Sequence, residues 1–173
     1  MAKWDEAAFT ECVERHSRFV FRVAYAVLRN SHDAEDVVQE IFLKLYRNGA
    51  WRDIRDERAY FARITWRAAV DRLPRKATAE LDEMEIVSDL PSPEQAALDA
   101  DWQGKVHRLI DALPEELRQP LALSTIQELT SAEIAQIMGI PEGTVRTRML
   151  RARQLLREKL TALEGKIYAS KRS

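Results

Sequence analysis

Residues 129–156, LTSAEIAQIMGIPEGTVRTRMLRARQLL, constrain the fold of this chain more than any other segment. Thr130, followed three residues later by Glu133, predicts a capping box at the start of a helix. Gly139 supplies the left-handed residue that commonly ends a helix, and Pro141 suits the first turn of the next one. Two short helices joined by a tight turn are the sequence form of a helix-turn-helix, whose second helix normally enters the major groove of DNA.

The second of these helices has two different faces when its residues are placed at about 100° per residue. One face is apolar and is expected to pack on the first helix: Val145, Met149, Ala152 and Leu156. The opposite face is small and polar, with arginine at its edges: Gly143, Arg146, Thr147, Leu150, Arg151 and Gln154. Because arginine binds guanine or phosphate, this face fits a DNA groove. The alternative is a solvated basic helix on an ordinary bundle.

Composition favours an all-helical protein without a membrane segment. The chain has 173 residues, 46% of them hydrophobic and 32% charged, with 5 glycines and no sustained period-two alternation. Its longest uncharged run, residues 119–127, is far shorter than the roughly 20 residues that span a bilayer. The first residues lack the apolar core of a signal peptide, which predicts a cytoplasmic protein. The single cysteine, Cys12, excludes an internal disulfide and is expected to be a small buried residue rather than a redox switch.

The net charge of −1 conceals an acidic middle segment. Residues 1–76 carry a net charge of +3, residues 77–112 carry −7, and residues 113–173 carry +3. A DNA-binding protein without an overall positive charge gains little non-specific affinity from counterion release. Delivery to DNA by another molecule is therefore expected.

Charge and helical spacing divide the chain into two helical domains and a tether. Residues 1–76 form the first domain, residues 77–100 a flexible acidic linker, and residues 101–173 the second domain. The first domain is expected to contain three helices. The first covers residues 4–29, with room for a break near His16, and the second covers residues 33–47, between a cap at Asn30 or Ser31 and a stop at Asn48-Gly49. The third covers residues 57–73 and ends at Pro74. Those of the second domain start near Ser92 and near Glu115, the latter with room for a kink at Pro120, and the last ends near Glu164 before a frayed tail.

The helix over residues 33–47 has an unexpected outward face. Its core stripe consists of Val37, Val38, Ile41 and Leu45. The opposite side consists of Asp36, Gln39, Glu40, Leu43 and Arg47. A leucine among acids on an outward face suggests a contact surface for a basic protein partner. A single exposed leucine is equally ordinary, so both interpretations stay open at this point.

The helix over residues 57–73 is apolar around most of its circumference. Its one polar stripe consists of Tyr60, Arg63, Arg67 and Asp71, and the preceding loop, residues 48–56, adds Trp51, Arg52 and Arg55. Aromatic rings stack on bases and guanidinium groups hold phosphates, so this set fits a surface for single-stranded nucleic acid. A solvated stripe beside a core tryptophan explains the same pattern equally well.

Three stretches together closely resemble bacterial sigma factors of the extracytoplasmic-function (ECF) class. They are DAEDVVQEIFLKLYR at residues 33–47, the helix ending in AVDRLPRK, and ALPEELRQPLALSTIQELTSAEIAQIMGIPEGTVRTRMLRARQLL at residues 112–156. The resemblance covers nearly the whole chain and places two motif-bearing domains in the family's order. It implies that the first domain is sigma region two and the second is region four. It also implies a protein that binds core RNA polymerase, recognises the −35 element with region four and opens the −10 element with region two. No enzymatic activity, cofactor or metal is expected.

The resemblance assigns roles to individual positions. Those matching the helix that docks on the polymerase clamp helices are Asp36, Gln39, Glu40 and Leu43. Those matching the −35-reading face are Arg146, Thr147, Leu150 and Arg151. Those matching the −10 loop and melting helix are Trp51, Arg52, Arg55, Tyr60, Arg63, Arg67 and Asp71. The family further implies an anti-sigma factor partner, and a linker threaded toward the active-site and RNA-exit channels of the polymerase.

The chain departs from the family pattern at three positions. Arg67 stands where the family often has asparagine, and Pro74 interrupts what is usually a run of basic residues. Pro120 is unusual inside the first helix of region four. These departures blur which −10 sequence is preferred but leave the predicted fold unchanged.

Two other classes of function compete with a sigma factor. A conventional helix-turn-helix regulator would form a dimer and bind a palindrome without polymerase. The face of residues 36–43 and the missing ligand-pocket signature argue against it. An enzyme is disfavoured because His16, His32 and His107 are widely spaced and form no metal-ligand cluster, and no glycine-rich phosphate loop is present.

Overall fold

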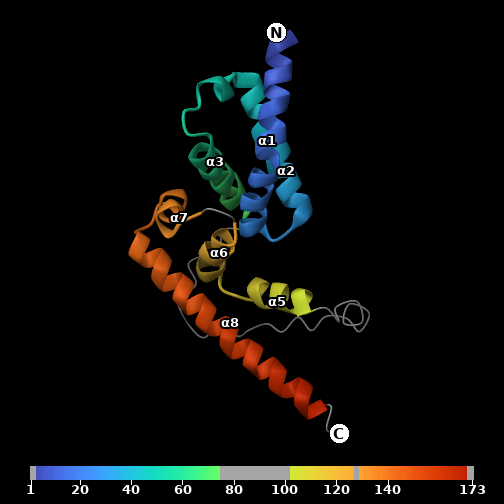
Figure 1. Cartoon of the computed structure of the whole chain (residues 1–173), viewed down its shortest axis with the longest axis vertical. Coiled ribbons are helices and arrows are strands. Elements are labelled where there is room, and N and C mark those ends of the chain that lie inside the picture. Colours follow the sequence, from blue (N-terminus) through green and yellow to red (C-terminus); the bar gives the residue numbers. More distant parts are fainter. Residues whose placement is uncertain (1–2, 75–101, 127–128, 171–173) are drawn as a thin grey trace. The chain divides into compact units, whose positions relative to one another are not determined.

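The computed structural model describes residues 3–74, 102–126 and 129–170, and every regular element in these ranges is a helix (Figure 1). The elements are α1 (Lys3–Leu28), α2 (Ser31–Asn48), the 3₁₀ helix η1 (Ala50–Asp53), α3 (Glu57–Arg72), α5 (Trp102–Asp111), α6 (Glu115–Ser124), α7 (Ser131–Met138) and α8 (Glu142–Ser170). The all-helical prediction is confirmed for this part of the chain. No helix within it is long and apolar enough to cross a membrane.

The described residues form two compact units. One unit contains residues 3–74, 122–126 and 129–146, and the other contains residues 102–121 and 147–170. The predicted acidic linker, residues 77–100, and the helix start near Ser92 lie outside the described residues.

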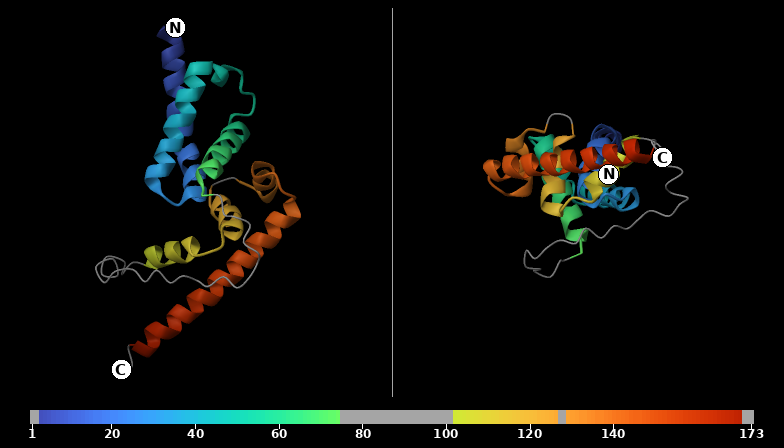
Figure 2. Two further views of the ribbon diagram at one scale, coloured as in Figure 1. Left: turned by 180° about the vertical axis from the view of Figure 1, so that it is seen from behind. Right: turned by 90° about the horizontal axis from the view of Figure 1, so that it is seen from below.

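Helices α1, α2 and α3 pack side by side as a bundle (Figures 1 and 2). Its core is formed by apolar side chains from all three helices, including Val20, Val37, Ile41, Leu45 and Phe61, each at most 5% exposed. Because every helix presents an apolar stripe to the other two, burial of these stripes holds the bundle together.

Local signals set the ends of the bundle helices as predicted. The Asn30 side chain accepts a hydrogen bond from the backbone N–H of Asp33 and caps α2. Gly49 ends α2 in the left-handed conformation, with φ of 68°. The Asp56 side chain caps α3, and α3 ends two residues before Pro74.

The predicted break in α1 near His16 is wrong, because α1 is continuous from Lys3 to Leu28. Histidine does not itself break a helix, and here tertiary contacts hold it in place. The His16 ring stacks on the Phe61 ring with centroids 4.5 Å apart, and its Nε2 lies 2.7 Å from Glu57 Oε2. Both partners belong to α3, so a residue that looked like an interruption joins two helices.

The helix-turn-helix forms as its signals predict. Thr130 Oγ1 accepts a hydrogen bond from the Glu133 backbone N–H, and the Glu133 carboxylate accepts one from the Thr130 backbone N–H at 2.7 Å. This reciprocal pair is the predicted capping box. Gly139 is left-handed, with φ of 67°. Pro141 immediately precedes α8, and its carbonyl accepts hydrogen bonds from two residues of the first turn.

The later helices agree with the prediction at Pro120 and differ from it at the C-terminal end. Pro120 lies inside α6, as predicted, and is fully buried, and α6 runs on to Ser124. Apolar packing of α6 compensates for the backbone hydrogen bond that a proline cannot donate. The last helix continues to Ser170 rather than ending near Glu164, so the segment predicted to fray is helical up to that residue. Residues 165–170 contain no proline and include good helix formers such as Lys166 and Ala169, so nothing local stops the helix.

Candidate nucleic-acid and protein interfaces

The two faces of α8 are those that the sequence predicts. Val145, Met149 and Ala152 are buried, and Leu156 is partly buried against the cluster of Leu113, Leu117 and Leu121. The predicted groove-facing residues Arg146, Thr147, Leu150 and Arg151 are all exposed. Leu150, at the centre of this face, is 68% exposed. The helix therefore presents a ready surface with an apolar centre and cationic edges.

The charge of Arg146 is held only weakly in place. Its guanidinium donates a hydrogen bond to Glu142 one turn earlier on α8, and both side chains are well exposed. An exposed ion pair of this kind contributes little to stability and exchanges easily for another partner. Arg146 is therefore available to a base or a phosphate.

The outward face of α2 is also exposed as predicted. Asp36, Gln39, Glu40 and Leu43 all face solvent, while Val37, Ile41 and Leu45 on the opposite side are buried and Val38 is partly buried. Leu43 is 50% exposed. Gln39 also lines an open groove between α1 and α2, whose apolar walls are Phe21 and Val38. This combination of acids, an amide and an exposed leucine can contact a basic, partly apolar protein surface.

Sequence reasoning missed two residues on or beside this face. Tyr46, one turn after Leu43, is 40% exposed, and the spacing of three residues was the signal that could have found it. Arg72 of α3 donates a hydrogen bond to Glu40, with Nη2 to Oε2 at 2.6 Å. The contact between Arg72 and Glu40 could not be predicted from a local sequence pattern, because the two residues are 32 positions apart.

In the loop before α3, Trp51 is occupied by tertiary packing. Its ring centroid lies 5.4 Å from that of Phe9, and the Arg52 guanidinium lies over it at 5.0 Å. Arg52 also forms a 3.2 Å ion pair with Asp5 of α1. Arg55 is exposed. The loop is thus anchored to α1 by its aromatic residue, and its arginines lie at the surface.

The polar stripe of α3 is only partly a solvent-facing surface. Arg63, Arg67 and Asp71 are exposed, as predicted. Tyr60 is partly buried and packs against the bundle core, with its ring centroid 5.9 Å from that of Phe61. The structure therefore brings two arginines and one acid together on the outside, and directs the stripe's aromatic residue toward the core.

Structural contacts shift the pKa values of ionisable groups in the unit that contains α3. The hydrogen bond with His16, helped by Arg15, holds the pKa of the Glu57 carboxyl below its ordinary value. The backbone N–H of Thr130 likewise lowers the pKa of Glu133. Burial raises the pKa of the Cys12 thiol, which is 6% exposed, as expected for a small buried residue.

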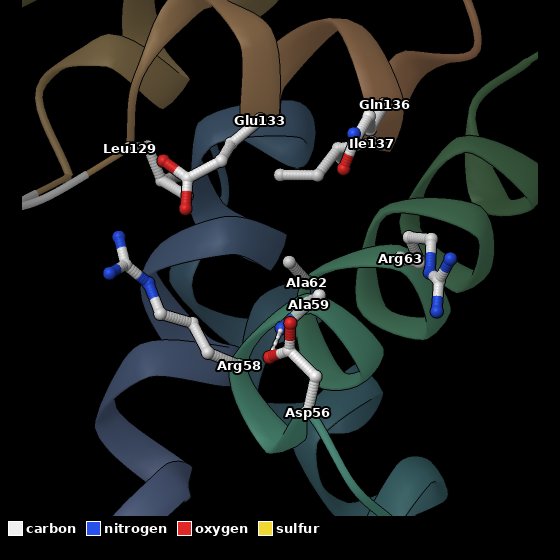
Figure 3. Close-up of a pocket in the computed structure, with 9 residues that line it drawn as sticks. All are labelled: Asp56, Arg58, Ala59, Ala62, Arg63, Leu129, Glu133, Gln136 and Ile137. Atoms are coloured by element: carbon white, nitrogen blue, oxygen red, sulfur yellow. Dashed lines mark hydrogen bonds between the residues drawn. The ribbon is translucent and has the colours of Figure 1, made fainter.

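Within the first unit, α3 and α7 line a small pocket (Figure 3). Its lining residues are Asp56, Arg58, Ala59, Ala62, Arg63, Leu129, Glu133, Gln136 and Ile137. Alanines and an isoleucine face one another across it, and the charged groups lie around them (Figure 3). In the parts of the chain that the structure describes, no group of three or more His, Cys, Asp or Glu side chains could hold a metal ion.

Comparison with known proteins decides the family. Residues 12–78 match the family model described as Sigma-70 region 2, and residues 103–156 match Sigma-70, region 4. The ECF RNA polymerase sigma factor SigW of Bacillus subtilis is 33% identical over 174 residues, covering 93% of this chain and 93% of SigW. The chain belongs to the ECF sigma factors. The family that the sequence resembles is thereby confirmed.

Two solved structures share the fold of this sigma factor. CnrH in complex with the cytosolic domain of CnrY has 25% identity and a TM-score of 0.62, covering 91% of this chain and 90% of CnrH. The sigma factor RpoE of Bartonella quintana, solved with the anti-sigma factor NepR, has 17% identity and a TM-score of 0.60 over 89% of this chain and 97% of RpoE. Sigma factors initiate transcription and are not enzymes, and the comparisons do not favour the dimeric regulator.

Proposed function

We propose that this ECF sigma factor binds core RNA polymerase through the outward face of α2 and delivers two DNA-binding surfaces to a promoter. The main supporting observation is a row of exposed residues on a helix whose opposite side is buried: Asp36, Gln39, Glu40 and Leu43. An exposed leucine within an acidic and amide surface fits the clamp helices of the polymerase, which the family docks on at this position.

In this proposal the exposed face of α8 recognises the −35 element. Arg146 and Arg151 contact bases or phosphates at the edges of the major groove, while Thr147 and Leu150 contact base edges between them. The surface is short and the chain's net charge is −1, so the isolated protein is expected to bind duplex DNA weakly.

The loop with η1 and the polar stripe of α3 open the −10 element. Arg52, Arg55, Arg63 and Arg67 hold the phosphates of the displaced strand, with Asp71 at the end of the same stripe, while Trp51 and Tyr60 present partly buried rings beside them. Flipping a base out of the stack costs a few kcal/mol, which pocket and stacking contacts offset. Opening is thus driven by binding energy.

Residues 1–76 and 101–173 are proposed to act as the two promoter-binding domains, and residues 77–100 as the linker through the polymerase channels. Because the polymerase fixes the spacing of the two domains, the second DNA contact becomes effectively intramolecular. We also propose a cytoplasmic location, where the polymerase works. An anti-sigma factor that covers the polymerase-binding surfaces is the expected regulator, since CnrH and RpoE were each solved with a bound protein partner.

Run-off transcription with core polymerase on a promoter library tests this function directly. The expected result is initiation from promoters that share one −35 and one −10 sequence, with no comparable duplex binding by the free protein. Tight, sequence-specific duplex binding by the isolated chain would contradict the proposal, because it would leave the polymerase without a role in recognition.

Single substitutions separate the two surfaces. Arg146→Ala is expected to lower transcription from promoters with the matched −35 element by about tenfold, since a bidentate arginine contact is worth about 1–3 kcal/mol. Arg157→Ala removes the same charge from an exposed position about 16 Å further along α8 and serves as the control.

Leu43→Ala is expected to weaken polymerase binding, whereas Leu150→Ala removes an exposed leucine elsewhere and leaves polymerase binding intact. Loss of polymerase binding by Arg146→Ala would show that the face of α8 is misassigned.

A further inference from the structure

Arg72, the last residue of α3, reaches across to the outward face of α2. Its Nη2 donates to Glu40 Oε2 at 2.6 Å, and its Nη1 lies 3.9 Å from Asp36 Oδ2. Asp36 and Glu40 are one helical turn apart on α2. A single guanidinium therefore contacts both carboxylates of the surface proposed to bind the polymerase.

The direction of Arg72 differs from that of the other α3 arginines. At about 100° per residue, Arg72 lies about 180° around the helix from Arg63 and about 140° from Arg67. Within the described part of the chain, Arg63 and Arg67 form no ion pair and face solvent. Arg72 thus directs its charge to α2, while the other two leave theirs available to phosphates.

Stability does not account for this contact. The side chain of Arg72 is 34% exposed, and those of Glu40 and Asp36 are 56% and 52% exposed. Ion pairs at such exposure contribute little to the free energy of folding. Their geometric effect is larger, because a glutamate side chain samples several rotamers when free and a short charge-assisted hydrogen bond selects one of them.

We infer that Arg72 is a positioning residue of the polymerase-docking face: it holds Glu40 in one orientation before the polymerase arrives. This inference rests on the proposed function of α2. A side chain ordered in advance does not lose its freedom at the moment of docking, so the complex forms more tightly. Arg72 acts through Glu40 and makes no contact with promoter DNA.

The test is a double-mutant cycle on the full chain, measured as affinity for core polymerase by fluorescence competition. Arg72→Ala is expected to weaken binding about 3- to 10-fold, and Arg72→Lys to recover part of that loss. In a Glu40→Ala background, Arg72→Ala should weaken binding less than about twofold, because the group it positions is gone. Arg22→Ala removes an exposed arginine from α1 and is the charge-matched control.

Promoter opening at saturating polymerase supplies the second readout. It should be unchanged in Arg72→Ala, and the thermal unfolding midpoints of all variants should agree with that of the wild type. Unchanged polymerase affinity combined with reduced opening would overturn the inference and assign Arg72 to DNA. An equal effect of Arg72→Ala with and without Glu40 would also overturn it, since coupling is what the inference requires.

The cycle also separates this inference from the proposed function. If Leu43→Ala and Glu40→Ala both leave polymerase affinity unchanged, the docking face itself is misassigned. If both weaken binding while Arg72→Ala does not, the docking face stands and only the positioning role of Arg72 is lost.

Discussion

The helix-turn-helix of α7 and α8 and the bundle of α1, α2 and α3 place their exposed arginines by different means. In the helix-turn-helix, a capping box, a left-handed Gly139 and helical spacing are all local in sequence. Arg146 and Arg151 then face outward because Val145 and Ala152 beside them face inward. The surface follows from one helix and its caps.

In the bundle, contacts between distant residues decide which side chains are available. Trp51 packs on Phe9, and Arg72 binds Glu40. Residues of similar type on neighbouring turns therefore have different surroundings, as the exposed Arg67 and the paired Arg72 show. Substitutions in the core of the bundle are therefore expected to change which of its side chains are exposed. The exposure of side chains on α8 depends mainly on the helix itself.

The largest effect that distinguishes the two regions is expected from Phe61→Ala. Phe61 is fully buried in the bundle, where its ring lies 4.5 Å from that of His16 and 5.7 Å from that of Phe42. Loss of the ring should lower the free energy of unfolding by about 3–5 kcal/mol. Urea denaturation followed by circular dichroism measures this loss.

Leu150→Ala is the control for that measurement. It removes a side chain of similar apolar character that is 68% exposed on α8, so its effect on stability should stay within about 0.5 kcal/mol. A comparable loss in both variants would mean that the exposed leucine has a structural role, and the contrast between the two regions would fail.

The next largest effect concerns the arginines that the bundle leaves exposed. Replacing Arg63 and Arg67 with alanine together should weaken holoenzyme binding to a single-stranded −10 oligonucleotide by about tenfold. The slope of log affinity against log salt should fall in magnitude by about 1.4, since each phosphate contact to a single strand contributes about 0.7. Arg72→Ala should leave this slope unchanged. An equal change of slope in Arg72→Ala would show that all three arginines contact phosphate.

Sequence alone predicted most of the helix-turn-helix because its determinants are short-range. The capping box of Thr130 and Glu133, the left-handed Gly139 and the two faces of α8 each follow from residues a few positions apart. The exposure of Arg146, Thr147, Leu150 and Arg151 was therefore predictable. Their roles in binding the −35 element stay predictions, as do the roles of the other site residues.

The bundle was less predictable wherever a partner lies far along the chain. Spacing identified the buried and exposed sides of α2 but could not reveal that Arg72 contacts it. The stripe on α3 was predicted as polar, yet Tyr60 leans into the core because Phe61 and its neighbours offer an apolar surface. The contact of His16 with Glu57 likewise joins residues that are 41 positions apart.

A smaller effect tests how far the helix-turn-helix depends on backbone conformation. A Cβ added at Gly139 or at Gly143 would meet no atom within 4 Å, so space does not distinguish these two sites. Gly139 has φ of 67°, and Gly139→Ala should therefore cost about 1–2 kcal/mol. Gly143 lies within α8, and Gly143→Ala should stabilise the protein by about 0.5–1 kcal/mol. Thermal unfolding measures both, and effects of the same sign would contradict the local account of this turn.

The smallest effect concerns the pH dependence of stability. It compares Glu57, whose carboxylate is bound by side chains of another helix, with Glu133, whose carboxylate is bound within its own helical turn. The pKa of Glu57 in the folded protein lies below its ordinary value of 4.5 because of His16 and Arg15. Its contribution to stability is therefore fully present above about pH 4.5 and is lost as pH falls through the lowered pKa. Glu57→Gln should lower the free energy of unfolding at neutral pH by less than about 1 kcal/mol, because the side chain is 37% exposed. The difference from the wild type should vanish in acid.

Glu133→Gln is the local counterpart of that substitution. The pKa of Glu133 is also lowered, chiefly by the backbone N–H of Thr130, but glutamine can take the place of glutamate in a capping box. Its cost at neutral pH should therefore be smaller than that of Glu57→Gln, which removes the negative charge that pairs with Arg15 on α1. Urea denaturation at a series of pH values between neutral and acid measures both profiles. Equal losses of stability by Glu57→Gln and Glu133→Gln at neutral pH would contradict this expectation. They would mean that a carboxylate bound by side chains of another helix contributes no more to stability than a carboxylate bound within its own helical turn.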